Sequence, residues 1–292
     1  VTLTLGASFD AINDKTNYSD PANPSVEYDR DKDQINPKIG VAWSPAQDTT
    51  VRAAYFRVLK RPLITNQTLE PTQVAGFNQF YDDIDATDAK SYGIGIDQKF
   101  SKKLFVGAEY YHRDLSVPYE YQFIDMGTGV IQATETRQAD WDERLARAYL
   151  YWMPHDQWAV SAEYLNERFN QSDRAYEFNL GTSSVETVRV PLGVRFYHSS
   201  GFSIMARATY FDQNGEFPAF DPGTGSIVFV SKDARFWLYD AAISYRFPGR
   251  YGMFQVGGKN LSDRKFEYYD TDYTNPAIQP KSFYYARLSL TF

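Results

Sequence analysis

Three histidines are the side chains best suited to catalysis or zinc binding, because the sequence contains no cysteine. His112, His155 and His198 are spaced 43 residues apart, whereas HExxH-type zinc sites place their ligands within one short segment. No G-x-S-x-G nucleophile elbow occurs either. We therefore predict that the protein is not an enzyme and has no catalytic residue, no metal site and no cofactor.

Alternating carboxylates mark the segment 29–33, DRDKD. Asp29, Asp31 and Asp33 have the spacing that opens an EF-hand loop, but the following glycine and the distal glutamate of such a loop are missing. We interpret the segment as an exposed acidic loop.

The elements that position these side chains repeat every two residues, which is the period of a β-strand. In the first segment Leu3, Leu5 and Phe9 alternate with Thr4, Gly6 and Ser8. Twelve such strands are predicted, at 1–10, 36–44, 50–60, 90–101, 103–114, 142–153, 157–168, 186–198, 201–212, 234–247, 250–262 and 281–292.

The connections between these strands alternate between two lengths. Links of a few residues, such as 154–157 and 248–250, alternate with polar links of 17 to 29 residues, such as 61–89 and 115–141. A soluble sandwich has water at both ends and no reason to sort its loops, whereas an outer-membrane barrel has short periplasmic turns and long extracellular loops. Strands of about 10 residues also suit a tilted bilayer crossing. We predict an all-β, antiparallel, up-and-down transmembrane β-barrel of about twelve strands, forming a single domain over 1–292.

Composition and charge agree with this fold. The chain has 37 acidic and 30 basic side chains, which argues against a nucleic-acid partner. Its mean hydropathy of -0.50, with no apolar run near 20 residues, excludes a helical membrane protein. Tyr, Trp and Phe gather at strand ends and predict membrane-interface positions at Trp43, Trp152, Trp158, Phe247 and Tyr251. The expected location is the outer membrane of a Gram-negative bacterium, in contact with the bilayer and lipopolysaccharide.

If the apolar residues of each strand face lipid, the alternating partners face a lumen. This assignment predicts a charged inner wall of ten basic and four acidic residues: Lys38, Arg52, Asp97, Glu109, Arg113, Arg147, Glu163, Arg189, Arg195, Arg207, Asp240, Arg246, Lys259 and Arg287. One interpretation is a positive lumen that favours anions. The alternative is that Arg and Glu on neighbouring strands pair, stabilising the wall or contacting a plug.

Several segments resemble TonB-dependent receptor barrels. Residues 35–45, INPKIGVAWSP, followed by 50–57, TVRAAYFR, are similar to a periplasmic hairpin of that family, and 257–267, GGKNLSDRKFE, to its penultimate strand. The last strand, with Tyr284, Leu288, Leu290 and Phe292, looks like the C-terminal signal read by the barrel assembly machinery. Residues 69–83, LEPTQVAGFNQFYDD, also resemble a loop of receptor-like barrels attached to tetratricopeptide repeat domains.

The resemblance implies about twenty-two strands and an N-terminal plug with a TonB box, and this chain begins within a strand. Two expectations stay open: the C-terminal barrel portion of a longer chain with an N-terminal or periplasmic partner domain, or a self-contained twelve-stranded pore. The leading function is passage of a solute or polymer through a charged lumen gated by long loops. The alternatives are TonB-dependent ligand uptake, and a structural or adhesive barrel with a closed lumen.

Overall fold

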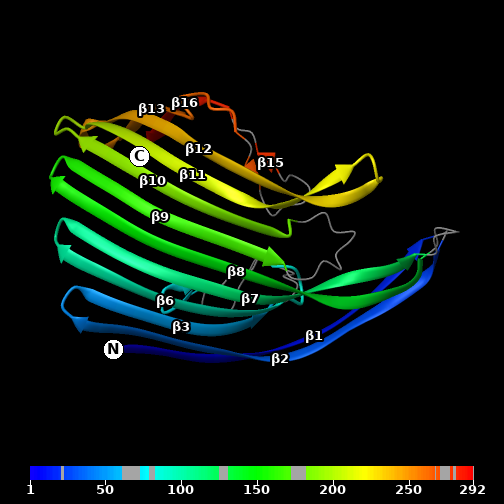
Figure 1. Cartoon of the computed structure of the whole chain (residues 1–292). Helices are drawn as coiled ribbons and strands as arrows, with labels where there is room; N and C mark the ends of the chain where they lie inside the picture. The colour runs from blue at the N-terminus through cyan, green and yellow to red at the C-terminus, as the bar shows by residue number, and fades with distance from the viewer. Residues whose placement is uncertain are drawn as a thin grey trace.

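A computed structural model describes residues 1–20, 23–60, 73–78, 83–124, 131–171, 182–266, 268–269, 277–278 and 281–291. Twelve strands in these ranges form one antiparallel sheet in which each strand pairs with the next along the chain (Figure 1). This confirms the all-β, up-and-down architecture and its twelve strands. The strands are β1 (Thr2–Asp20), β2 (Asn23–Ala46), β3 (Thr49–Leu59), β6 (Asp88–Ser101), β7 (Leu104–Ile124), β8 (Ile131–His155), β9 (Trp158–Gln171), β10 (Ser184–Tyr197), β11 (Phe202–Asp221), β12 (Ser226–Arg246), β13 (Gly252–Lys259) and β16 (Phe283–Leu290).

The sheet is open, with β1 at one edge and β16 at the other (Figure 1). Closure into a barrel requires curvature and a register stagger that bring the first and last strands into hydrogen-bonding contact. These twelve strands do not curve far enough to pair β1 with β16. The sheet is therefore not closed, and the twelve-stranded pore that closes on itself is not observed.

Three of the predicted long links are largely strand. β1 and β2 stay paired from Thr2↔Ala42 to Asp20↔Asn23, and β7 and β8 from Leu104↔Trp152 to Ile124↔Ile131. β11 and β12 extend in the same way to a turn at 222–225. The prediction placed these residues in loops because they lack apolar alternation. A strand extension outside the lipid needs none, since its ladder of backbone hydrogen bonds continues without a lipid-facing side.

The opposite ends of the strands are joined by short turns, as predicted, including the 3-10 helix η1 (Pro248–Arg250). Gly201 and Gly249 adopt positive φ of 91° and 68° in two of these turns, a conformation that glycine reaches without steric cost. No helix in the described ranges is long and apolar enough to cross a membrane.

Side chains divide between two faces of the sheet. We call the apolar face the one that carries exposed residues such as Leu5, Ile94, Ile243 and Leu288, whose exposed fractions lie between 52% and 68%. Large apolar side chains exposed in this way are unfavourable in contact with water and favourable in contact with lipid. The opposite face, which we call the charged face, carries the predicted wall residues.

The main packed core lies on the charged face. There the short hairpin formed by β4 (Gln73–Val74) and β5 (Phe77–Asn78) packs Val74 and Phe77 against Phe56 and Tyr111. Val74 and Phe56 are each 1% exposed. This hairpin covers part of the wall that positions the candidate site. The described part of the fold also includes a second small hairpin, β14 (Tyr268–Tyr269) with β15 (Ala277–Ile278).

Candidate functional site

The strand register places all fourteen predicted wall residues on the charged face. Arg52 lies opposite Gly95, Gly95 opposite Glu109, and Glu109 opposite Arg147, so these positions form one row across four strands. Residues directly opposite each other in an antiparallel pair project from the same side. The same reasoning, followed through each pair of strands, reaches Arg287 on β16 through Gln255.

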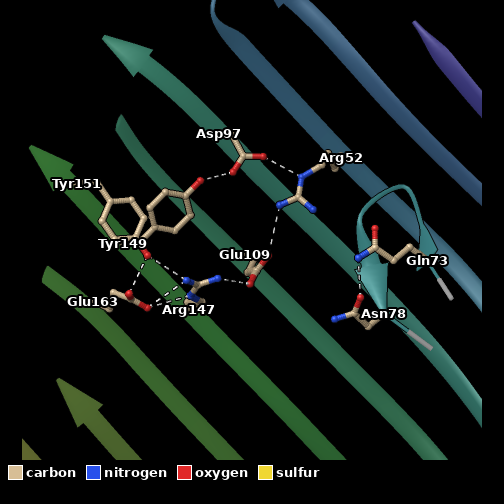
Figure 2. A network of polar contacts seen from close by, with 9 residues as sticks. All are labelled: Arg52, Gln73, Asn78, Asp97, Glu109, Arg147, Tyr149, Tyr151 and Glu163. Atoms are coloured by element: carbon tan, nitrogen blue, oxygen red, sulfur yellow. Dashed lines mark hydrogen bonds and ion pairs between the residues drawn. The ribbon is translucent and has the colours of Figure 1, made fainter. Parts of the chain in front are cut away.

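A continuous ionic network runs across β3, β6, β7, β8 and β9 (Figure 2). Arg52 donates to Asp97 at 2.8 Å and to Glu109 at 3.3 Å, and Glu109 also accepts from Arg147 at 3.4 Å. Arg147 continues the network to Glu163 at 3.1 Å. Each carboxylate thus lies between or beside cations, which offsets the cost of holding charge at a partly buried wall.

Two tyrosines complete this network. The Tyr149 hydroxyl donates to Asp97, and the Tyr151 hydroxyl donates to Glu163 at 2.7 Å (Figure 2). The Arg147 guanidinium also lies 5.2 Å from the centre of the Tyr149 ring, within cation–π range. Sequence reasoning missed both tyrosines because it selected charged residues only, although their alternation with Arg147 on β8 would have placed them on the same face.

Other predicted wall residues on this half are also engaged. Arg113, 6% exposed, donates to Glu143 at 2.6 Å and to Asp83 at 2.5 Å. Arg189 pairs with Glu167 at 3.5 Å, and Lys38 is buried. The pairing interpretation therefore describes the wall from β2 to the β9–β10 pair.

The other half of the charged face, on strands β10–β16, differs in that most of its cations are exposed. Five cations on it are exposed and make no ion pair with any residue that the structure describes: Arg195, Arg207, Arg246, Lys259 and Arg287. Asp240 is the acidic member of the predicted set here, and its Oδ1 accepts the backbone N–H of Asn260 at 3.0 Å. Arg195 and Arg246 line one cavity of about 470 Å³ together with Ser203, Ser244 and Gln255.

The profile of the family "TonB dependent receptor-like, beta-barrel" matches residues 1–261. The chain belongs to this family. Its membership places the protein in the outer membrane of Gram-negative bacteria, as a TonB-dependent receptor-like barrel. No curated protein sequence matches the chain.

Solved structures show the same fold at low identity. The Neisseria meningitidis FrpB iron transporter matches with a TM-score of 0.65 and 14% identity over 98% of this chain and 42% of its own. Pseudomonas aeruginosa FpvA bound to a heterologous pyoverdine matches at 0.60 and 12%, over 98% and 36%. The ferric-catecholate import receptor Fiu from E. coli K12 matches at 0.56 and 16%, over 97% and 41%. The chain thus spans about two fifths of the length of these receptors.

In this receptor-like barrel the five predicted interface aromatics all lie at the short-turn ends of strands. Trp43 precedes the β2–β3 turn, Trp152 and Trp158 flank the β8–β9 turn, and Phe247 and Tyr251 flank η1. A second group, which sequence reasoning did not single out, lies toward the other end of the apolar face. It contains Tyr55, Tyr92, Tyr110, Tyr164, Tyr210 and Trp237. Two such groups suit the two interfaces of a bilayer.

The predicted assembly strand corresponds to β16, where Tyr284, Leu288 and Leu290 alternate on the apolar face. Phe292 lies outside the described residues. Of the segment 69–83, which resembles a loop of barrels attached to tetratricopeptide repeat domains, 73–78 and 83 are described. Recognition by the assembly machinery stays a prediction.

One cluster of metal-ligating type arises from strand pairing. His112 Nε2 lies 2.7 Å from Asp142 Oδ2 and 3.0 Å from Asp114 Oδ1, beyond Tyr110 on the side of the long connections. Sequence spacing could not show this, because Asp142 is on the neighbouring strand. Arg144 also pairs with Asp142 at 2.8 Å and supplies positive charge to the carboxylates, so we assign no metal to the cluster.

Proposed function

We propose that this protein takes up a negatively charged ligand across the outer membrane, along a passage lined by the charged face. Uptake by a TonB-dependent receptor was one of the alternatives from the sequence, and family membership now favours it over polymer passage. A plug-type partner domain would occupy the barrel in such a receptor.

The observation that carries the proposal is the uneven neutralisation of the charged face. Between β3 and β9 the arginines contact carboxylates, whereas on β10–β16 five exposed cations have no described ion-pair partner. Cations that line a low-dielectric wall attract anions and raise their local concentration. Unpaired cations retain this attraction, and paired ones largely lose it.

The structural neighbours support a ligand of this kind. They include a receptor bound to a ferric pyoverdine, a ferric-catecholate import receptor and an iron transporter. We propose that the ligand here is an anionic chelate or another anionic solute of comparable size. Its polar and anionic groups would meet the cavity lined by Arg195 and Arg246.

Ion selectivity tests the proposal directly. The purified protein is inserted into planar bilayers, and the reversal potential is measured in a KCl gradient. We expect preference for chloride, and we expect the Arg195→Gln/Arg246→Gln variant to move the reversal potential toward zero or toward cation preference. The matched control is Arg235→Gln/Arg168→Gln, which removes the same charge from residues paired with Asp212 and Glu186 outside the charged face.

The possible results separate the candidate functions. Cation preference in the unmodified protein would contradict a passage lined by the cationic half. An equal shift in the control variant would show that total charge, and not the charged face, sets selectivity. A folded barrel that neither conducts nor takes up solute would favour the adhesive or structural role.

A further inference from the structure

The hairpin 73–78 is held against the charged face by a close apolar contact. Val74 and Phe77 are 1% and 4% exposed, and the Phe77 ring stacks on Tyr111 with centroids 6.0 Å apart. The Tyr111 hydroxyl donates to the backbone carbonyl of Asn78 at 3.1 Å. A segment with these contacts is part of the wall core.

Two glycines in the wall leave space for the side chains of the hairpin. A Cβ added at Gly93 would lie 2.6 Å from the Phe77 ring, and one added at Gly40 would lie 2.8 Å from Val74 and 3.0 Å from the Cβ of Ala75. Real Cβ atoms do not approach other atoms this closely, so only glycine leaves enough space at both positions. The recess is therefore complementary to this hairpin, on strands β2 and β6.

The turn of the hairpin has the backbone conformation of a tight two-residue turn. Ala75 and Gly76 both have positive φ, 48° and 86°, as a two-residue type I′ turn requires. Gln73 donates to Asn78 at 2.9 Å across the hairpin (Figure 2). The two ends of the hairpin are thus paired with each other as well as packed against the wall.

Arg52 joins the hairpin to the ionic network. Its guanidinium lies 5.1 Å from the centre of the Phe77 ring while it binds Asp97 and Glu109 (Figure 2). The cation beneath the hairpin is therefore held on one side by carboxylates and on the other by an aromatic face.

We propose that the hairpin 73–78 is a permanent ledge of the wall that covers the neutralised half of the charged face around Arg52 and Tyr111 and narrows the passage on that side. This inference rests on the proposed function only in taking the charged face as the lining of a passage. The hairpin, held in place by Phe77 and Val74, then contributes to size selection as a fixed element and not a gate.

Disulfide trapping tests whether the hairpin is docked. The chain has no cysteine, so each thiol counted with a maleimide is an introduced one. In outer membranes of cells expressing the protein, Gly40→Cys/Ala75→Cys should lose its free thiols by forming a disulfide, which needs Cβ atoms about 3.5–4.5 Å apart. Because Gly40 is crowded, Val74→Cys serves as a second measurement: the Val74 side chain is 1% exposed, so a thiol there should resist the maleimide, whereas Gln73→Cys at the exposed neighbouring position should react.

The matched control is Gly6→Cys/Ala75→Cys. Gly6 is also on the charged face, but a Cβ there would meet only Lys38, at 3.7 Å, so both thiols should remain reactive. Free thiols in Gly40→Cys/Ala75→Cys together with a reactive thiol in Val74→Cys, in protein that still shows heat-modifiable migration, would overturn the docked hairpin.

A transport measurement tests permanence and size selection. Locking the hairpin by the disulfide should leave the reversal potential and the conductance as they are in the reduced protein; a loss on locking would show a gate and overturn the ledge.

Gly93→Val and Phe77→Ala, which should displace the hairpin, should increase sensitivity to a large glycopeptide antibiotic, with Gly6→Val as control. Unchanged sensitivity in both folded variants would overturn size selection. A docked ledge in a barrel without anion preference would leave this inference standing and contradict only the proposed function.

Discussion

The assignment of the two faces can be tested by placing one arginine on each side of the same strand. Ile204 and Met205 are neighbours on β11, with Ile204 on the apolar face opposite Ile243 and Met205 on the charged face opposite Ala242. Both positions lie near the middle of the span. On β12 the aromatics Trp237 and Phe247 are ten residues apart, about 33 Å along the strand. At a tilt of about 40° this is roughly 25 Å along the membrane normal, the height of an outer-membrane apolar band.

An arginine on the lipid face at this depth costs about 2–4 kcal/mol of folding free energy. We therefore expect Ile204→Arg to lower the folding equilibrium constant by a factor of roughly 30 to 1,000, at about 1.4 kcal/mol per tenfold change. Met205→Arg points to the passage and should cost less than about 1 kcal/mol, most of it from repulsion by Arg195.

The difference in folding free energy between the two arginine variants is measured by urea-dependent folding into phospholipid vesicles. Tryptophan fluorescence and heat-modifiable migration on gels should give the same ranking of the two variants and the unmodified protein. Equal costs for the two arginines, or a larger cost at Met205, would refute the assignment of lipid to the apolar face.

Three further predictions follow from side-chain contacts. Glu109→Gln should lower the free energy of unfolding by about 1–2 kcal/mol in the same assay, since Arg52 and Arg147 each lose one charged partner, and Glu186→Gln at a more exposed pair should cost less. Gly107→Ala should destabilise the fold by about 1–3 kcal/mol, because its Cβ would collide with the Tyr149 ring, and near-ultraviolet circular dichroism should report the displaced tyrosine. Hydrogen bonds from Gly223 N–H and the Thr224 hydroxyl lower the pKa of Asp221. The protection factors of the β11–β12 turn amides, which correct for the intrinsic pH dependence of exchange, should therefore be highest above the carboxyl's ordinary pKa and should fall as pH falls through the lowered value, whereas Asp221→Ala should show low protection factors at every pH.

The membrane-crossing part of each strand was predictable, and the outward extensions of β1, β2, β7, β8, β11 and β12 were not. Where one face meets lipid, apolar residues must alternate, as at Ile94 and Ile96 on β6, and the period of two is visible in the sequence. Beyond the bilayer neither face meets lipid, so the alternation that lipid imposes ends although the backbone pairing continues. That is why β2 begins at Asn23 and not at residue 36.

The candidate site was also predictable only in part. Alternation fixes which side of a strand a residue occupies, and so it grouped Arg52, Glu109 and Arg147 on one face. It contains no information on register, which decides that Glu109 stands between the two arginines and that Tyr149 reaches Asp97. The recess for the hairpin depends on Gly40 and Gly93 lying beneath residues 73–78, a long-range contact with no periodic signal in the sequence.

Burial accounts for where the carboxylates are found on the charged face. The Arg113 and Arg52 side chains, near the hairpin, are 7% and 17% exposed, and an unpaired charge with so little water would be strongly destabilising. Carboxylates are therefore required there, and each guanidinium has two. Arg195, Arg207 and Arg246 are exposed, so water stabilises their charges and no acidic partner is needed. The ledge and the uneven charge are then two aspects of one arrangement: the hairpin shields the wall around Arg52, and the exposed cations on β10–β16 stay free to bind an anion.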